Sequence, residues 1–214
     1  MKPFVILFVA LSLGACGEPP ASRATGVYML LDTSGTYTEE IDKAQQIINF
    51  TLARLQPGDT FAVARVDTAS FSEKDIVAKA TFDERPSTAN GQKRTFQTEI
   101  NEFVGSVRPS PYTDISGGLL QALEFLEEKA PGRRTIFIFS DLKEDLDEGY
   151  VRDFPLTFTD VDVVALNVTK LRSDNLDPRE YLDRLAAWQQ RVEQGGGRWR
   201  VINDLDHLER LFRS

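Results

Sequence analysis

Short apolar runs alternate with amphipathic helical patterns along most of this chain, and that alternation restricts it to a small group of folds. Residues 27–31 (VYMLL) and 135–139 (TIFIF) are continuous apolar runs of the kind found in strands buried on both faces. Apolar residues at helical spacing lie between these runs, as expected for helices that cover a sheet. The alternation is typical of α/β domains. We therefore expect a three-layer, Rossmann-like, doubly wound α/β fold with a mostly parallel central sheet flanked by helices.

The same patterns place the expected elements along the chain. Strands are expected at residues 27–31, 60–66, 76–82, 135–139, 161–168 and 199–202. Helical faces are expected within residues 41–55, 96–107, 115–126, 181–192 and 205–212. The strand at 76–82 is the more polar one and is expected at a sheet edge, whereas 83–93, rich in Pro, Ser, Asn and Gly, is expected to be a loop. No internal repeat or linker divides residues 25–214, so they are expected to form one domain.

The N-terminal residues have the features of an export signal. A lysine precedes an apolar run that is too short to span a bilayer permanently, and small residues follow it. The sequence Leu-Gly-Ala-Cys, which ends at Cys16, resembles the bacterial lipobox, in which the cysteine carries lipid such as palmitate. We therefore expect a lipoprotein signal peptide at residues 1–15, and the lipidated Cys16 with a polar tether at residues 16–24. An ordinary signal peptide cut after Ala15 is the alternative.

That resemblance implies a place in the bacterial cell envelope. A chain anchored through several acyl groups at Cys16 would be held durably at a membrane, facing the periplasm. By the sorting pattern of Gram-negative lipoproteins, Gly17 after the cysteine favours the outer membrane over the inner one.

Composition excludes several classes of function. The 214 residues carry a formal net charge of −8, which argues against nucleic acid as a partner, because phosphates require clustered Lys and Arg. Cys16 is the only cysteine and His207 the only histidine, so the chain cannot form an internal disulfide or a zinc site of the usual Cys/His kind. His207 is expected on a solvated helix face, which argues against a serine hydrolase.

Three separate segments place oxygen-bearing side chains after an apolar strand or at a helix start. Asp32, Ser34 and Thr36 follow the first strand, Thr113 precedes a helix that begins near position 114, and Asp141 follows the strand at 135–139. In a parallel sheet these positions lie at the carboxyl ends of the strands, where ligands collect. Carboxylates and hydroxyls are hard oxygen ligands that suit Mg²⁺ or a similar cation. The segments therefore predict one metal site.

The order Asp-x-Ser-x-Thr, Thr-x-Ile-x-x-Gly-Leu and an apolar strand ending in Asp resembles the von Willebrand factor A family over about residues 25–213. The resemblance implies that Asp32, Ser34, Thr36, Thr113 and Asp141 occupy metal-site positions, with Mg²⁺ or Mn²⁺ usual and Ca²⁺ a further candidate. It also implies that the cation takes an Asp or Glu side chain from a protein partner. The expected function is thus adhesion or assembly, not catalysis.

Two local features near this motif carry further expectations. Gly117 and Gly118 are expected to let their helix pack closely on the sheet. Leu142 follows Asp141 where many relatives have Gly, which leaves the shape of that loop open. The acidic run at 144–148 is expected to be a solvated loop, with a rim that tunes the choice of partner as the alternative.

One enzymatic alternative uses the same first segment. Asp32-Thr33-Ser34-Gly35-Thr36 also resembles the phosphorylation loop of haloacid-dehalogenase-like phosphatases, in which Asp32 would be a nucleophile. Against this, position 33 is not Lys, Ser34 replaces the acid, and the candidate acidic pair Asp174 and Asp177 does not directly follow a strand. A purely structural domain with a vestigial site is the third hypothesis.

Overall fold

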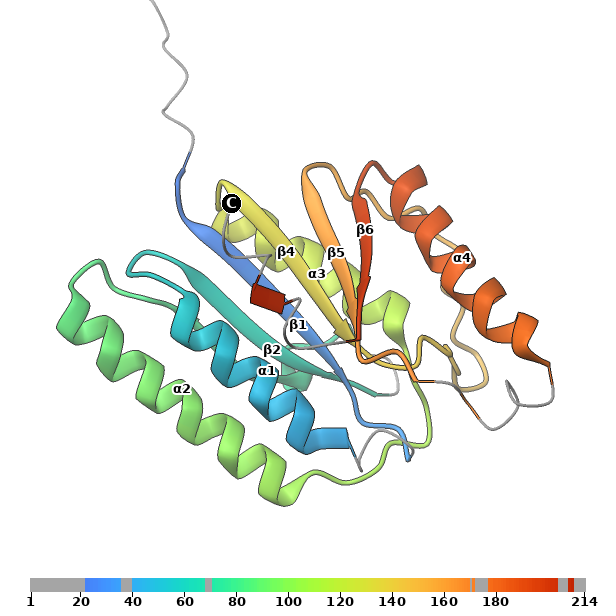
Figure 1. Ribbon diagram of the computed structural model, residues 1–214, viewed down its shortest axis with the longest axis horizontal. Helices are drawn as coiled ribbons and strands as arrows, with labels where there is room; N and C mark the ends of the chain where they lie inside the picture. The colour runs from blue at the N-terminus through green and yellow to red at the C-terminus, as the bar shows by residue number, and fades with distance from the viewer. Residues whose placement is uncertain are drawn as a thin grey trace, which may run out of the picture.

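A computed structural model of the chain describes residues 22–35, 40–67, 71–169, 171, 177–203 and 208–209. Its core is a six-stranded sheet with the order β3-β2-β1-β4-β5-β6 (Figure 1). The strands are β1 (Thr25–Asp32), β2 (Thr60–Val66), β3 (Ile76–Thr81), β4 (Arg133–Phe139), β5 (Val161–Leu166) and β6 (Arg198–Ile202). The edge strand β3 is antiparallel to β2, and the other neighbouring pairs are parallel. The predicted fold class and the edge position of the third strand are confirmed.

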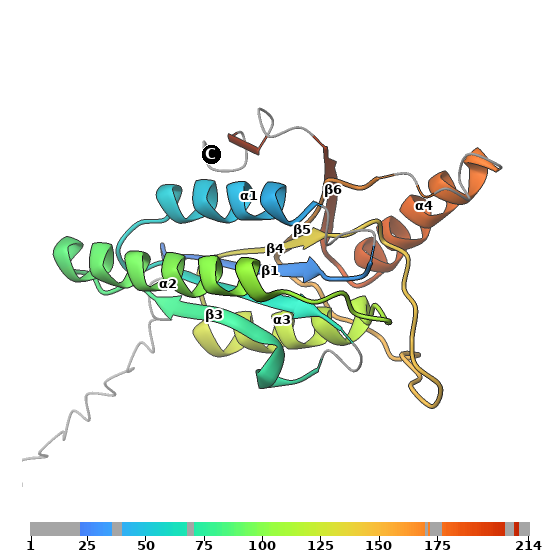
Figure 2. The ribbon, with the colours of Figure 1, turned by 90° about the horizontal axis from the view of Figure 1, so that it is seen from below.

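Helices cover both faces of the sheet (Figure 2). The helices α1 (Ile41–Arg54) and α2 (Pro86–Ser106) pack on one face, and α3 (Ile115–Lys129) and α4 (Pro178–Gln194) pack on the other. Alternate residues of β1 point to opposite faces, so Met29 joins the first core cluster and Leu30 the second. Because helices cover both faces of the sheet, a central strand buries the side chains on both of its sides, which explains the continuous apolar runs.

The strand order reverses between β1 and β4, and this reversal defines the functional edge of the sheet. The chain runs outward from β1 through β2 to β3, returns through α2 and α3, and then runs outward on the other side from β4 to β6. β1 and β4 are parallel neighbours, with Leu31 paired to Phe139. In open α/β sheets ligands bind beyond the carboxyl ends of the strands at such a switch point.

The predicted loop at residues 83–93 is wrong, because α2 already begins at Pro86. Pro86 occupies the first turn of the helix, where its missing N–H costs nothing and its fixed φ favours helix. Ala89 is buried against the core, and the Lys93 ammonium donates to the Leu55 carbonyl, so packing on α1 extends the helix through residues of low helix propensity.

Several predictions fall on residues outside the described ranges. These are the signal peptide at 1–15, Cys16 and most of its tether, Thr36, and most of the last expected helix, including His207. Within the described ranges, none of the helices combines the length and apolar character needed to span a membrane.

Candidate metal centre

Asp32 ends β1 as a buried carboxylate with two defined hydrogen-bond partners. Its side chain is fully buried, and it directly follows the buried run from Val27 to Leu31. The backbone N–H of Ser34 donates to Asp32 Oδ1 at 2.8 Å, and the Ser140 hydroxyl donates to Oδ2 at 2.6 Å. Both donors are neutral, so neither balances the charge that an ionised Asp32 would hold in the protein interior.

Asp141 lies two residues beyond the end of β4, beside the end of β1. Its side chain is 4% exposed, and its Oδ1 accepts a 2.8 Å hydrogen bond from the backbone N–H of Lys143. Because β1 and β4 pair in parallel up to Leu31 and Phe139, Asp32 and Asp141 emerge from neighbouring strands at the same edge. The structure therefore brings the two predicted carboxylates to the switch point of the sheet.

The loop after Asp141 has a left-handed turn at Leu142, where φ is 65°. A non-glycine residue in this conformation costs about 1–2 kcal/mol. The Leu142 side chain is buried in the core under α3 and α4, and its N–H donates to Ser140 Oγ at 3.0 Å. These contacts explain how a leucine can occupy a position where related motifs use glycine.

Thr113 is held at the same end of the sheet by backbone pairing with the loop that follows Asp141. Its N–H donates to the Asp145 carbonyl at 2.7 Å, and its carbonyl accepts from the Asp145 N–H at 3.0 Å. The next residue, Asp114, is the N-cap of α3, and its Oδ1 accepts from the Gly117 N–H at 2.8 Å. The helix thus starts at Ile115, where it was predicted to start, and Thr113 stands immediately before the cap.

Two glycines in the first turn of α3 allow this arrangement. A Cβ atom on Gly118 would lie 2.8 Å from Leu30 Cδ2, which confirms that this glycine lets the helix approach the sheet. The same prediction is wrong for Gly117, where a Cβ atom would lie 2.5 Å from the Asp114 carboxylate, so this glycine makes room for the capping side chain.

Ser34 belongs to a short parallel bridge with Ser110, which joins the first loop to the segment before Thr113. The Ser110 N–H donates to the Thr33 carbonyl at 2.7 Å within this bridge. Hydrogen bonds therefore connect the loops that carry Asp32, Ser34, Thr113 and Asp141. The fifth predicted ligand, Thr36, lies outside the described residues.

Burial dominates the electrostatics of the two carboxylates. Desolvation raises the pKa of Asp32, against the lowering effect of the hydrogen bonds from Ser140 and Ser34. Desolvation also raises the pKa of Asp141, to about 6, and the neighbouring charge of Asp32 adds to the rise, while hydrogen bonding to Lys143 and the positive charges of Arg184 and Lys143 oppose it. In the described part of the chain, neither carboxylate forms an ion pair.

This donor set fits a hard divalent cation. Among the described residues, no three His, Cys, Asp or Glu side chains are placed so that they could hold a metal ion together, so an ion here would draw its remaining ligands from hydroxyls and water. Mg²⁺ is commonly held in this way, by one or two carboxylates with several retained waters. Two buried acids that form no ion pair within the described ranges are the electrostatic complement of such an ion.

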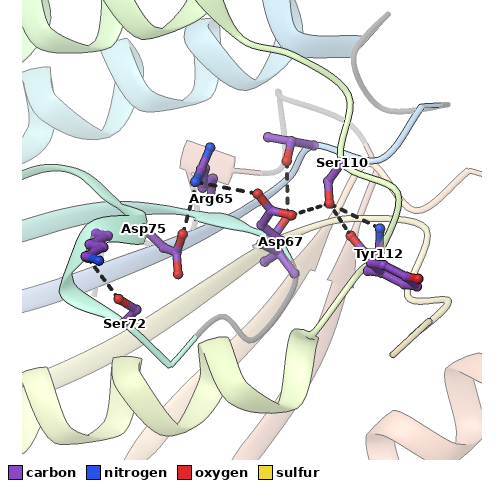
Figure 3. Close-up of polar contacts among 9 residues, drawn as sticks. Arg65, Asp67, Ser72, Asp75, Ser110 and Tyr112 are labelled. Carbon is purple, nitrogen blue, oxygen red and sulfur yellow. Dashed lines mark hydrogen bonds and ion pairs between the residues drawn. The ribbon is translucent and has the colours of Figure 1, made fainter. Parts of the chain in front are cut away.

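The structure adds polar residues to this edge that were not predicted. Asp67 directly follows β2, and it accepts a 2.5 Å hydrogen bond from the Ser110 hydroxyl (Figure 3). Arg65 lies between Asp67 and Asp75, with ion-pair distances of 3.5 Å and 3.2 Å (Figure 3). The position of Asp67 at the end of a parallel strand was the sequence signal that could have identified it. Asp67 fixes the loop that carries Ser110 and hence the bridge to Ser34.

The prediction of a solvated acidic loop at 144–148 is wrong for its first member. Glu144 Oε1 accepts a 2.7 Å hydrogen bond from the Ser116 N–H in the first turn of α3. A carboxylate at a helix N-terminus satisfies a backbone donor and interacts favourably with the helix dipole. The acidic segment is therefore part of the structure that supports the Thr113 loop.

Arg152 provides a second support for the start of α3. Its Nη2 lies 2.6 Å from Asp114 Oδ2, and its Nε donates to both oxygens of the same carboxylate. The Asp114 side chain is 1% exposed and that of Arg152 17% exposed, so the pair is largely removed from water. This pair neutralises Asp114, in contrast to Asp32 and Asp141.

One residue of the phosphatase alternative has a different structural role. Asp177 is the N-cap of α4, where it accepts from the Arg179 N–H and pairs with the Arg179 guanidinium at 2.7 Å. Asp174, the other member of the proposed acidic pair, lies outside the described residues. No observation in the described structure favours Asp32 as a nucleophile.

No protein-family model matches the sequence, and no curated protein matches it. Solved structures do match its fold. A von Willebrand factor type A protein from Catenulispora acidiphila has a TM-score of 0.52 and 17% identity, with 90% of this chain and 41% of that one covered. The open conformation of the pilus adhesin SpaC from Lactobacillus rhamnosus GG has a TM-score of 0.55 and 10% identity, with coverages of 89% and 29%.

An aerotolerance-related membrane protein from Bacteroides fragilis has a TM-score of 0.52 and 13% identity, with 88% of this chain and 96% of that one covered. The chain thus spans less than half of the first two proteins and nearly all of the third. At these identities the likeness concerns the fold alone. The described chain has the fold of a von Willebrand factor type A domain.

Proposed function

We propose that this chain is an envelope lipoprotein whose von Willebrand factor A domain binds a divalent cation and, through it, an acidic side chain of a protein partner. The proposed ligands are Asp32, Ser34, Thr36, Thr113 and Asp141. The observation that carries the proposal is the pair of buried carboxylates, Asp32 and Asp141, which meet at the switch point of the sheet without an ion pair among the described residues. A bound cation would supply a Lewis-acidic position for a carboxylate from outside.

The rest of the chain supports an interaction role for this site. A formal net charge of −8 disfavours direct contact with an acidic partner, whereas a cation at the sheet edge would reverse that repulsion locally. Two of the compared structures are named as a pilus adhesin and a membrane protein, which agrees with a role at the cell surface. Mg²⁺ is the first choice, with Mn²⁺ and Ca²⁺ as alternatives.

Thermal unfolding tests the metal site. The Tm of the full-length chain in a non-ionic detergent would be measured in EDTA, Mg²⁺, Mn²⁺ and Ca²⁺. The Asp32→Ala variant would be measured under the same conditions. A ligand that binds only the folded state stabilises it, by about 2.7 kcal/mol at a free concentration of 100 Kd. We expect a metal-dependent rise in Tm for the wild type and none for the variant. Equal Tm values in EDTA and at millimolar cation would reject the site.

Two further measurements test the partner and the anchor. Acidic peptides immobilised on a surface should retain the chain in Mg²⁺ and release it in EDTA, and the matched peptides with Asn and Gln should not retain it. Metabolic labelling with a palmitate analogue should mark the wild type but not Cys16→Ser. Labelling of both proteins, or of neither, would reject Cys16 as the anchor.

A further inference from the structure

Three side chains on one face of α4 reach across to the loops of the proposed metal site. Arg184, Trp188 and Arg191 are spaced by four and three residues, so they lie in one row along the helix. Each donates a hydrogen bond to a residue in or beside a loop that carries a proposed ligand. The helix packs on the sheet through Val192 and Trp188, with Tyr181 and Leu185 partly buried beside them.

Trp188 holds the strained turn after Asp141. Its indole Nε1–H donates to the Leu142 carbonyl at 2.9 Å, and the side chain is only 6% exposed. Leu142 is the residue with φ of 65°, and its own N–H is bound to Ser140 Oγ. The two hydrogen bonds fix both peptide groups around Leu142, in a conformation that the leucine would not favour by itself.

The two arginines extend the same contact toward both ligand loops. Arg184 Nε donates to the Asp141 carbonyl at 2.8 Å. Arg191 Nη1 donates to the Ser116 hydroxyl at 2.6 Å, in the first turn of α3, and its guanidinium lies 5.2 Å from the centre of the Trp188 ring. One helix therefore contacts the backbone of the Asp141 loop and the helix start that follows Thr113.

We propose that α4 positions the metal site, with Trp188 and Arg184 holding the Asp141–Leu142 backbone so that the Asp141 carboxylate is presented at the sheet edge. This inference rests on the proposed cation-binding function. Trp188 and Arg184 are positioning residues, because they bind the main chain of the ligand loop and not the ligand oxygens. Residues that orient metal ligands in this indirect way commonly change affinity by about 10- to 100-fold when they are replaced.

The Arg184→Met variant distinguishes a positioning role from a simple charge effect, because the two predict opposite changes in Mn²⁺ affinity. Its positive charge lies near the Asp141 carboxylate and opposes a cation there. Electrostatics alone would therefore make Arg184→Met bind Mn²⁺ more tightly. Loss of the hydrogen bond to the Asp141 carbonyl would instead loosen the loop, so the positioning role predicts weaker binding.

The experiment measures Mn²⁺ affinity by titration calorimetry and Tm in EDTA for the full-length chain in detergent. Trp188→Phe keeps a buried aromatic ring, although a smaller one, and removes the indole N–H donor, and we expect its Kd for Mn²⁺ to rise about tenfold. Arg184→Met should raise the Kd for Mn²⁺ as well. It provides the test of the positioning role if Trp188→Phe does not fold. The matched control is Val192→Ala on the same helix, which should lower the Tm in EDTA but change the Kd less than about twofold.

The outcomes are distinct. A Kd for Trp188→Phe within twofold of wild type, tighter binding by Arg184→Met, or a Kd for Val192→Ala raised as much as for Trp188→Phe would each overturn the positioning role and leave the metal site standing. Absence of Mn²⁺ binding by the wild type itself would overturn the proposed function, and the positioning role with it.

Discussion

The hydroxyl of Ser140 donates a 2.6 Å hydrogen bond to Asp32 Oδ2, joining residues 108 positions apart at the edge of the sheet. Ser140 is fully buried, and its oxygen also accepts from the Leu142 N–H at 3.0 Å. A single hydroxyl thus satisfies the carboxylate that ends β1 and one peptide group of the turn after β4. The two loops are coupled through it.

Replacement of this hydroxyl should therefore destabilise the protein in the absence of metal. Ser140→Ala leaves the buried Leu142 N–H and one Asp32 oxygen without this partner, at a cost of about 2 kcal/mol. Urea unfolding in EDTA measures the change. Ser106→Ala, which removes an exposed hydroxyl bonded to the Glu102 carbonyl on α2, should cost less than about 0.5 kcal/mol. Similar losses in the two variants would contradict the coupling.

Asp162 should make part of the stability depend on pH. This β5 residue accepts hydrogen bonds from Arg198 and Arg200 on β6, which lower its pKa. An acid whose pKa is lower in the folded state stabilises above its unfolded value, about 3.9, and loses that contribution as pH falls toward the folded value.

Asp162→Asn should accordingly cost about 1 kcal/mol at pH 7, since both arginines are largely exposed. The difference from wild type should shrink steadily below about pH 4. Chemical unfolding of both proteins from pH 7 to pH 3 measures it. A difference that stays constant over this range would show that packing, not charge, is responsible.

Local patterns were sufficient to predict most of the fold. The buried runs that became β1 and β4 needed only their apolar residues, because a central strand of a covered sheet is apolar on both faces. The start of α2 could not be predicted in the same way. Its first turns contain Pro86 and Gly91, and they are helical because packing on α1 outweighs their low propensity.

The candidate site likewise contains residues that local sequence patterns could predict and residues that they could not. Asp32, Ser34, Thr113 and Asp141 could be proposed because each stands beside a recognisable strand end or helix start. The hydrogen bond from Ser140 to Asp32 was not predicted, because the two residues are 108 positions apart in the sequence. The contacts of Arg152 and Trp188 could not be foreseen, because both residues reach the site from distant parts of the chain and no local pattern specifies their partners.

Replacing only one residue of the Asp114–Arg152 pair should strongly destabilise the protein. Arg152→Ala leaves the Asp114 carboxylate buried without its cation, which should cost about 3–5 kcal/mol. Asp114→Asn retains an oxygen for the Gly117 N–H, so the double variant should recover part of that loss. Unfolding free energies of the four proteins give the coupling. Additive losses would show that the two side chains act independently.

Asp32→Asn should separate stability from binding. Asn keeps the shape of the side chain, an oxygen for the Ser34 N–H and an amide N–H that can donate to the Ser140 oxygen. It removes a charge that burial makes unfavourable, as the raised pKa of Asp32 indicates. In EDTA at pH 7 the variant should therefore be as stable as wild type or more stable, by about 1 kcal/mol. In saturating Mg²⁺ the order should reverse, because only the wild type gains the free energy of binding. The measurement is Tm with and without Mg²⁺, with Asp162→Asn as a control whose deficit should be the same in both conditions. If Asp32→Asn were less stable than wild type in EDTA, Asp32 would be a structural residue whose ionised form the fold itself stabilises.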